Sequence, residues 1–303
     1  MSQRPPKNVP ASVRTRLLNE AKACGDSFDQ VLQYFAIERF LYRLSQTPWS
    51  ERFIVKGAVM LRAWDGPRSR PTRDIDVLGR VDNSPETIER AVRECLSIEC
   101  PDDGLVFYPE IETTVITTER AYPGVRAVVR GDLDGAVFKL QVDIGIDDAV
   151  VPDPVWTDYP TLLDLTSPRI LVYHPVTAIA EKFETIVNRG AANSRLRDYF
   201  DIWALSRSRT ISGCELRSAV AATFAHRKTP LPGEVPPGLG AGFYADQETQ
   251  KRWRSFLKTK RLDAPDSLAD VCEAIVIFVM PPVIAAASGE QFTATWDPSE
   301  GWS

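Results

Sequence analysis

Apolar residues change their spacing near Pro152, and this change limits the chain to a few architectures. Before Pro152, several short segments alternate apolar and polar residues, as strands with one buried face do. After it, apolar residues recur every three or four positions, which is typical of amphipathic helices. We therefore predict an α+β fold with two domains. Residues 1–152 would hold two N-terminal helices and a mixed sheet flanked by helices, and residues 153–303 a mainly helical domain.

Each part has a definite set of expected elements. In the first part, strands are expected over residues 52–55, 74–78, 111–117, 125–129 and 138–146. Helices are expected over two segments between residues 11 and 46, and over residues 58–64 and 85–96. In the second part, helices are expected over residues 176–188, 197–206, 216–227, 247–261 and 268–279, and a loop rich in proline and glycine over residues 229–242.

The composition argues against several classes of protein. Of the 303 residues, 44% are hydrophobic and 25% are charged, which is ordinary for a globular protein with a core. Five cysteines without a Cys-x-x-Cys pair argue against a disulfide framework or a zinc site, and they fit a reducing cytoplasm. The polar, proline-rich N-terminus lacks an apolar stretch, so we expect no secretory signal there. The apolar run over residues 271–287 is too short to span a membrane comfortably, so we expect a buried helix and no membrane partner.

An Asp-x-Asp pair stands at the start of the strand expected over residues 74–78. Residues two apart on a strand point the same way, so Asp74 and Asp76 present their carboxylates on one face, roughly 7 Å apart. Such a pair suits Mg²⁺, with Mn²⁺ as the alternative, because Mg²⁺ takes one or two carboxylates and adds water and phosphate oxygens. Taken alone the pair is weak evidence, since aspartates at strand ends more often cap a turn or face water.

Two further features raise the weight of that pair. Lys56 and Gly57 form a turn before a helix, whose backbone amides could cradle a triphosphate at the positive end of the helix dipole. On the strand over residues 138–146, Asp143 lies on the polar face. If that strand neighbours the Asp74 strand, Asp143 completes a cluster of three carboxylates able to hold two metal ions. The alternative is a solvent-facing aspartate on an edge strand.

Several segments, in order along the chain, carry a resemblance to a known family. They are residues 53–57 (FIVKG), 73–76 (RDID), 180–184 (AEKFE), 193–202 (NSRLRDYFDI) and 296–298 (WDP). Together they resemble the AbiEii/AbiGii (MenT-like) toxin family of nucleotidyltransferases. The resemblance implies a DNA-polymerase-β-like core, a helical C-terminal domain that completes the active-site cleft, a nucleoside triphosphate donor and a cognate antitoxin. It also implies transfer of a nucleotide to RNA, with the 3′ end of tRNA as the expected acceptor and a block of translation as the result.

The resemblance assigns roles to individual residues. It implies that Asp74 and Asp76 are metal ligands, and it matches Lys182 and Asp198 to the family's helical lysine and aspartate. These four residues form the expected catalytic set. Lys182 would neutralise triphosphate oxygens as a compact charge, and Asp198 would orient that lysine or the base. The alternatives are a solvated helical lysine and a polar residue near the start of a helix.

The nucleotide is expected to contact residues on both sides of the carboxylate pair. The expected contacts are Lys56, Gly57, Ala58, Thr72 and Lys182. Ala58 departs from the Gly-Ser pattern of polymerase-β-like enzymes and offers no hydroxyl, so backbone amides must serve instead. Thr72 stands two residues before Asp74, where its hydroxyl could touch the triphosphate or receive an inhibitory modification.

A basic helix offers a surface for nucleic acid. The chain has a net charge of −5, so any nucleic-acid contact must use a local basic patch. The helix over residues 247–261 places four cations along one side: Lys251, Arg254, Lys258 and Arg261. This side is either a ridge for RNA phosphates or a solvated face. Two other functions also stay open: transfer to a protein or small-molecule hydroxyl, and a non-catalytic nucleotide-binding module.

Overall fold

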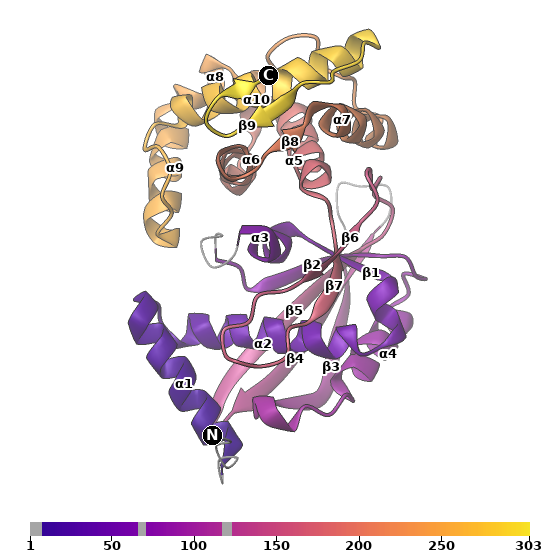
Figure 1. The fold of residues 1–303 in the computed structure, drawn as a ribbon, viewed down its shortest axis with the longest axis vertical. Coiled ribbons are helices and arrows are strands. Elements are labelled where there is room, and N and C mark those ends of the chain that lie inside the picture. Colours follow the sequence, from indigo (N-terminus) through magenta and orange to yellow (C-terminus); the bar gives the residue numbers. More distant parts are fainter. Residues whose placement is uncertain (1–7, 66–70, 117–122) are drawn as a thin grey trace. The chain divides into compact units, whose positions relative to one another are not determined.

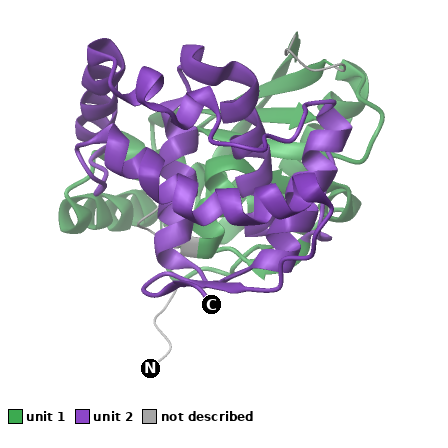
Figure 2. Cartoon of the chain, turned by 90° about the horizontal axis from the view of Figure 1, so that it is seen from above, with its two compact units in different colours: residues 1–147, 155–172 green, residues 148–154, 173–303 purple. Residues whose placement is uncertain are grey.

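The computed structural model describes residues 8–65, 71–116 and 123–303 (Figure 1). The chain forms two compact units, which Figure 2 shows in different colours. The first unit comprises residues 1–147 and 155–172, and the second comprises residues 148–154 and 173–303. The domain boundary expected at residue 152 therefore falls in a short segment that belongs to the second unit before the chain returns to the first.

The first unit begins with helices α1 (Val9–Cys24) and α2 (Phe28–Ser45). Asn8 and Ser27 cap them, because each side chain accepts a hydrogen bond from a backbone N–H of the first turn. Helix α2 buries twelve of its eighteen residues and contributes Phe35 to the core of the unit. It packs against the sheet, as Figure 1 shows.

A mixed seven-stranded sheet forms the centre of the first unit, with the order β3-β4-β5-β2-β1-β7-β6. Its strands are β1 (Phe53–Lys56), β2 (Asp74–Gly79), β3 (Val106–Ile116), β4 (Gly124–Leu133), β5 (Ala136–Gly145), β6 (Val155–Asp158) and β7 (Arg169–Val172). Strand β2 runs antiparallel to β1 and parallel to β5. Helix α3 (Gly57–Asp65) follows β1 directly, and α4 (Pro85–Leu96) packs on β3. The predicted mixed sheet flanked by helices is confirmed.

The expected strands of this sheet correspond to β1 through β5, with differences at their ends. Strand β3 begins five residues earlier than expected, at Val106, and Thr117 lies outside the described residues. Strands β6 and β7 were not expected. Each has only four residues, as β1 has, but neither is followed by the glycine turn and helix that indicated β1 in the sequence.

The second unit is mainly helical. Its helices are α5 (Pro175–Arg189), α6 (Leu196–Ser208), α7 (Gly213–Arg227), α8 (Ala241–Tyr244), α9 (Gln247–Lys260) and α10 (Leu268–Ser288). A small sheet of β8 (Ile211–Ser212), β9 (Thr295–Asp297) and β10 (Gly301–Trp302) completes it. The Trp-Asp-Pro segment forms part of this sheet, and Trp296 donates a hydrogen bond to the carbonyl of Ser206 over 2.7 Å.

Helix α10 contains the apolar run that was expected to be a buried helix. It continues through Pro281 and Pro282 instead of ending at residue 279. Burial of Pro282 and Val283 favours this continuation although prolines lack the N–H of a helical bond. By length and composition alone α10 could cross a membrane, as core helices of soluble proteins also could, and half of its most apolar stretch is buried.

Candidate active site

Strand β2 carries the two predicted carboxylates in the middle of the large sheet. Asp74 and Asp76 are both half-buried and share one face, because they stand two residues apart. Ile75 and Val77 point the opposite way and are almost completely buried. The apolar face of β2 thus anchors the strand in the core and fixes the direction of both carboxylates.

Gly57 lies directly against the carboxylate of Asp76. Lys56 is the register partner of Asp76, and Gly57 is the first residue of α3, with φ +67°. A Cβ placed on Gly57 would stand 2.2 Å from Oδ2 of Asp76. Both the positive φ and this close approach require glycine. The N–H groups at the start of α3 carry partial positive charge, so the position favours anions. Ala58 is 1% exposed, and its methyl group belongs to the core.

Asp143 occupies the position that the hypothesis of three carboxylates required. Strand β5 adjoins β2, and Asp143 is the register partner of Asp76. Both of its carboxylate oxygens, however, are bound by Arg126 of β4, over 2.8 Å from Nε and 2.9 Å from Nη2. Within residues 8–65, 71–116 and 123–303, no three acidic, cysteine or histidine side chains are grouped to hold a metal ion. A role for Asp143 as a metal ligand stays a prediction, and it would require Arg126 to release an oxygen.

Arg126 is the residue of this site that the sequence analysis did not identify. Its hydrogen bonds to Asp143 raise its pKa, and the charges of Asp143, Asp74 and Asp76 add to that effect, whereas burial opposes it. The guanidinium therefore experiences the field of all three carboxylates. It reduces the repulsion among them, because like charges at close range disfavour one another.

Thr72 is engaged with the backbone of the residue that starts β2. Its hydroxyl donates to the carbonyl of Asp74 over 3.1 Å and accepts from the N–H of the same residue over 3.3 Å. These bonds stabilise the turn that leads into the strand. Contact of Thr72 with a triphosphate, and its modification, both stay predictions.

Lys182 and Asp198 belong to the second unit, where they form an ion pair. Nζ of Lys182 lies 3.1 Å from Oδ1 of Asp198 and 2.7 Å from Oδ2 of Asp201. The side chain of Lys182 is 12% exposed and that of Asp201 is fully buried. Lys182 comes from α5 and both aspartates from the start of α6. The interpretation of Lys182 as a solvated helix residue is therefore wrong, and of the two roles expected for Asp198, the geometry fits the one that orients the lysine.

Asp201 was missed as a partner of Lys182, although a signal for it was present. It follows Asp198 by three residues, and on a helix such residues share a face.

Arg227 of α7 holds α5 through ion pairs with two of its glutamates, and it also pairs with Asp148. It lies 2.7 Å from Glu184 and 3.3 Å from Glu181, and it reaches Asp148 over 3.1 Å. These carboxylates raise the pKa of Arg227 above its ordinary value although burial opposes the shift.

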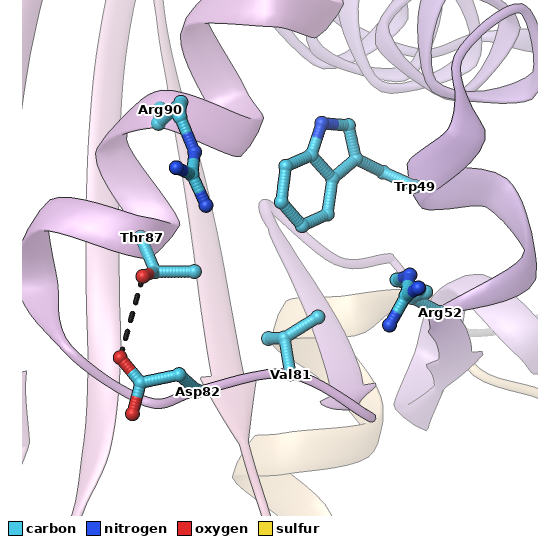
Figure 3. A pocket seen from close by; sticks show the side chains of 6 residues that line it. All are labelled: Trp49, Arg52, Val81, Asp82, Thr87 and Arg90. Atoms are coloured by element: carbon cyan, nitrogen blue, oxygen red, sulfur yellow. Dashed lines mark hydrogen bonds between the residues drawn. The ribbon is translucent and has the colours of Figure 1, made fainter.

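A separate pocket of about 330 Å³ lies at the opposite end of β1 and β2 (Figure 3). Among its lining residues, Arg52 precedes β1 and Val81 follows β2. The guanidinium carbon of Arg90 lies 5.8 Å from the ring centroid of Trp49. Asp82 accepts a hydrogen bond from Thr87 over 3.3 Å. The length of β2 places this pocket roughly 17 Å from the carboxylate pair. None of the predicted site residues lines it.

Comparisons with known proteins identify the family to which the chain belongs. Residues 39–276 match the family model described as nucleotidyl transferase AbiEii toxin, type IV TA system. Among solved structures, a Helicobacter pylori protein described as a candidate nucleotidyltransferase is similar, with 14% identity, a TM-score of 0.44, and coverage of 86% of this chain and 94% of that chain. The protein JHP933 from Helicobacter pylori is similar with 14% identity, a TM-score of 0.40, and coverage of 90% of each chain.

No curated protein matches the sequence. The family model spans most of the chain, including the carboxylate pair of β2, Lys182 and Asp198. The chain therefore belongs to the AbiEii family of nucleotidyltransferase toxins of type IV toxin–antitoxin systems.

Proposed function

We propose that this toxin uses Mg²⁺, or Mn²⁺, to transfer a nucleoside monophosphate from a nucleoside triphosphate to the 3′ end of tRNA. Translation would stop when the cognate antitoxin does not restrain the enzyme. The observation that carries this proposal is the approach of the Asp76 carboxylate to Gly57 at the start of α3. This approach supports the proposal, because a carboxylate is the kind of oxygen donor that a hard cation prefers and the backbone amides at a helix start suit phosphate.

Asp74 and Asp76 fit the metal that such chemistry needs. They are two oxygen donors on one strand face, and Mg²⁺ usually takes one or two carboxylates from protein and leaves its other positions to water and phosphates. When bound, the metal would polarise the phosphate and favour ionisation of the attacking hydroxyl. The residues of the chain position the partners: the amides of α3 bind the triphosphate, and Arg126 holds Asp143 in place.

Lys182 would contact triphosphate oxygens in the transfer as a positioned donor, because its ammonium group is paired with two carboxylates and adds no net positive charge. Asp198 and Asp201 hold its ammonium group in one place, which reduces the entropy lost when it binds phosphate oxygens. In the reaction, the oxygen of the acceptor 3′-hydroxyl bonds to the α-phosphorus and the bond to the β-phosphate oxygen breaks. Pyrophosphate leaves, and the hydroxyl proton passes to solvent. Phosphoryl-transfer sites act mainly by such positioning and charge stabilisation.

The test is transfer of label from each α-³²P nucleoside triphosphate to purified tRNA. We expect label in tRNA with the wild type and Mg²⁺, and none after addition of a chelator or with Asp76→Asn. Asp158→Asn, which changes an exposed aspartate on β6, is the matched control and should retain activity. Label that enters a protein and leaves tRNA unlabelled would contradict the RNA acceptor. Transfer that survives in Asp76→Asn would contradict the site itself.

A further inference from the structure

Helix α9 is held in one orientation by its apolar side. Thr249, Trp253 and Leu257 are buried at successive turns of the helix. Trp253 is 0% exposed, and its indole N–H donates to the carbonyl of Pro265 over 2.9 Å. Asp246 caps the first turn through the N–H of Thr249. The opposite side of α9 therefore faces outward from the second unit in a fixed way.

That outward side carries a concentration of positive charge. Residues 247–261 include six cations and one acidic residue, Glu248, in a chain whose net charge is −5. Lys251, Arg254 and Lys258 are exposed, and their spacing of three and four residues places them in one row. We call these three residues the α9 ridge. At 1.5 Å per residue, the ridge is about 10 Å long. In the described part of the chain, no carboxylate forms an ion pair with any of the three.

A pocket of about 440 Å³ adjoins the ridge. It is lined by Tyr244, Ala245, Gln247, Gln250, Lys251, Arg254 and Ser267. Gln250 is fixed, because its amide donates to the carbonyl of Asp266 and accepts from the N–H of Leu268. Lys251 and Arg254 belong to both the ridge and the pocket. The pocket thus combines two cations with the ring of Tyr244, a set that suits a nucleotide with its phosphate and its base.

We propose that the α9 ridge binds the phosphate backbone of the RNA acceptor and that the adjoining pocket receives one of its nucleotides. This inference rests on the proposed function in taking RNA as the acceptor. Three cations in a row without carboxylate partners attract a polyanion, since each neutralised phosphate releases condensed counterions. Such contacts position the nucleic acid and leave the reading of bases to other groups. Acidic residues stand near the N-terminal end of the helix: Asp246 at its cap, Glu248 in its first turn, and Asp266, whose carbonyl accepts a hydrogen bond from Gln250.

The experiment measures binding of fluorescently labelled tRNA by anisotropy, without nucleoside triphosphate, over a series of salt concentrations. One variant changes the ridge (Lys251→Gln, Arg254→Gln, Lys258→Gln). A matched control removes three exposed cations elsewhere (Arg16→Gln, Lys22→Gln, Lys228→Gln). We expect the ridge variant to raise the Kd about tenfold or more, and to reduce the slope of log K against log salt by about 2. The control should lose much less of both.

Two further proteins keep the inference separate from the proposed function. A variant that conserves the charge of the α9 ridge (Lys251→Arg, Arg254→Lys, Lys258→Arg) should bind tRNA nearly as the wild type does. Asp76→Asn should bind tRNA normally and transfer nothing. A ridge variant with wild-type Kd and salt slope overturns the inference, even if the wild type transfers nucleotide to tRNA. If the wild type neither binds nor labels tRNA, the RNA acceptor is wrong and the inference falls with it.

Discussion

Replacing Gly57 with alanine should disable the site while leaving the protein folded. The new methyl group would begin 2.2 Å from Oδ2 of Asp76, and ordinary contact starts at 3.4 Å, so the carboxylate must retreat. A displacement of about 1 Å at a reacting centre can cost on the order of a hundredfold in rate. The left-handed backbone at Gly57 adds roughly 1–2 kcal/mol of strain for any L-residue. We therefore expect nucleotide transfer to fall by about two orders of magnitude.

The assay pairs the rate of nucleotide transfer with the free energy of unfolding in urea. Gly25→Ala is the matched control, because Gly25 has φ +71° and nothing stands within 4 Å of an added Cβ. It should show the backbone strain without loss of activity. In an Asp76→Ala background, the stability cost of Gly57→Ala should approach that of Gly25→Ala, because most of the clashing group is gone. A Gly57→Ala enzyme with transfer within about threefold of the wild type would refute the reasoning.

Three other outcomes follow from ion pairs and burial. Arg126→Ala should strengthen Mg²⁺ binding in calorimetry by releasing Asp143, whereas Asp143→Asn in the wild type should change it little. Asp201→Asn removes the nearer, fully buried partner of Lys182, so the melting temperature should fall, and transfer measured below it should drop on the order of tenfold. Burial raises the pKa of Glu38 to about 7 against 4.5 for the free side chain, so the folded protein binds the extra proton and loses stability as pH rises between those values. The loss, up to about 3 kcal/mol, should disappear in Glu38→Gln when unfolding is measured from pH 5 to 8.

The carboxylate pair could be predicted because its evidence is local. Residues two apart on a strand share one face, and a Lys-Gly turn before a helix predicts a helix N-terminus that can bind anions. The ion pair between Arg126 and Asp143 depends on the register of β4 and β5. A signal for that register was present in Asp134-Gly135, where both residues have positive φ and form a two-residue hairpin turn. Counting outward from this turn places Arg126 opposite Asp143.

Other features could not be predicted from any single segment. The close approach of Gly57 and Asp76 arises only when β1 pairs with β2, and the sequence around neither residue indicates this pairing. Strand β6 pairs with β7, and β7 joins the sheet through β1, so the places of both strands depend on pairings between elements. In the second unit, the spacing of Asp198 and Asp201 indicates a shared helix face, but the meeting of that face with Lys182 depends on how α5 packs against α6. Each of these features is a contact between separate elements. The spacing of apolar residues along one segment gives no information about such contacts.

The engagement of Asp143 by Arg126 limits how the site can hold a metal. Arg126 binds both oxygens of Asp143, so Asp74 and Asp76 are the two carboxylates that we propose for the metal, and two carboxylates are about what one Mg²⁺ takes from a protein. Its remaining positions must then come from water and from the phosphates of the substrate. Metal and nucleoside triphosphate should consequently bind together more tightly than either alone, because each completes the surroundings of the other. Because Arg126 occupies Asp143, the phosphates of the substrate would complete the coordination of the metal ion. A second metal ion would require Asp143 to break its ion pair with Arg126.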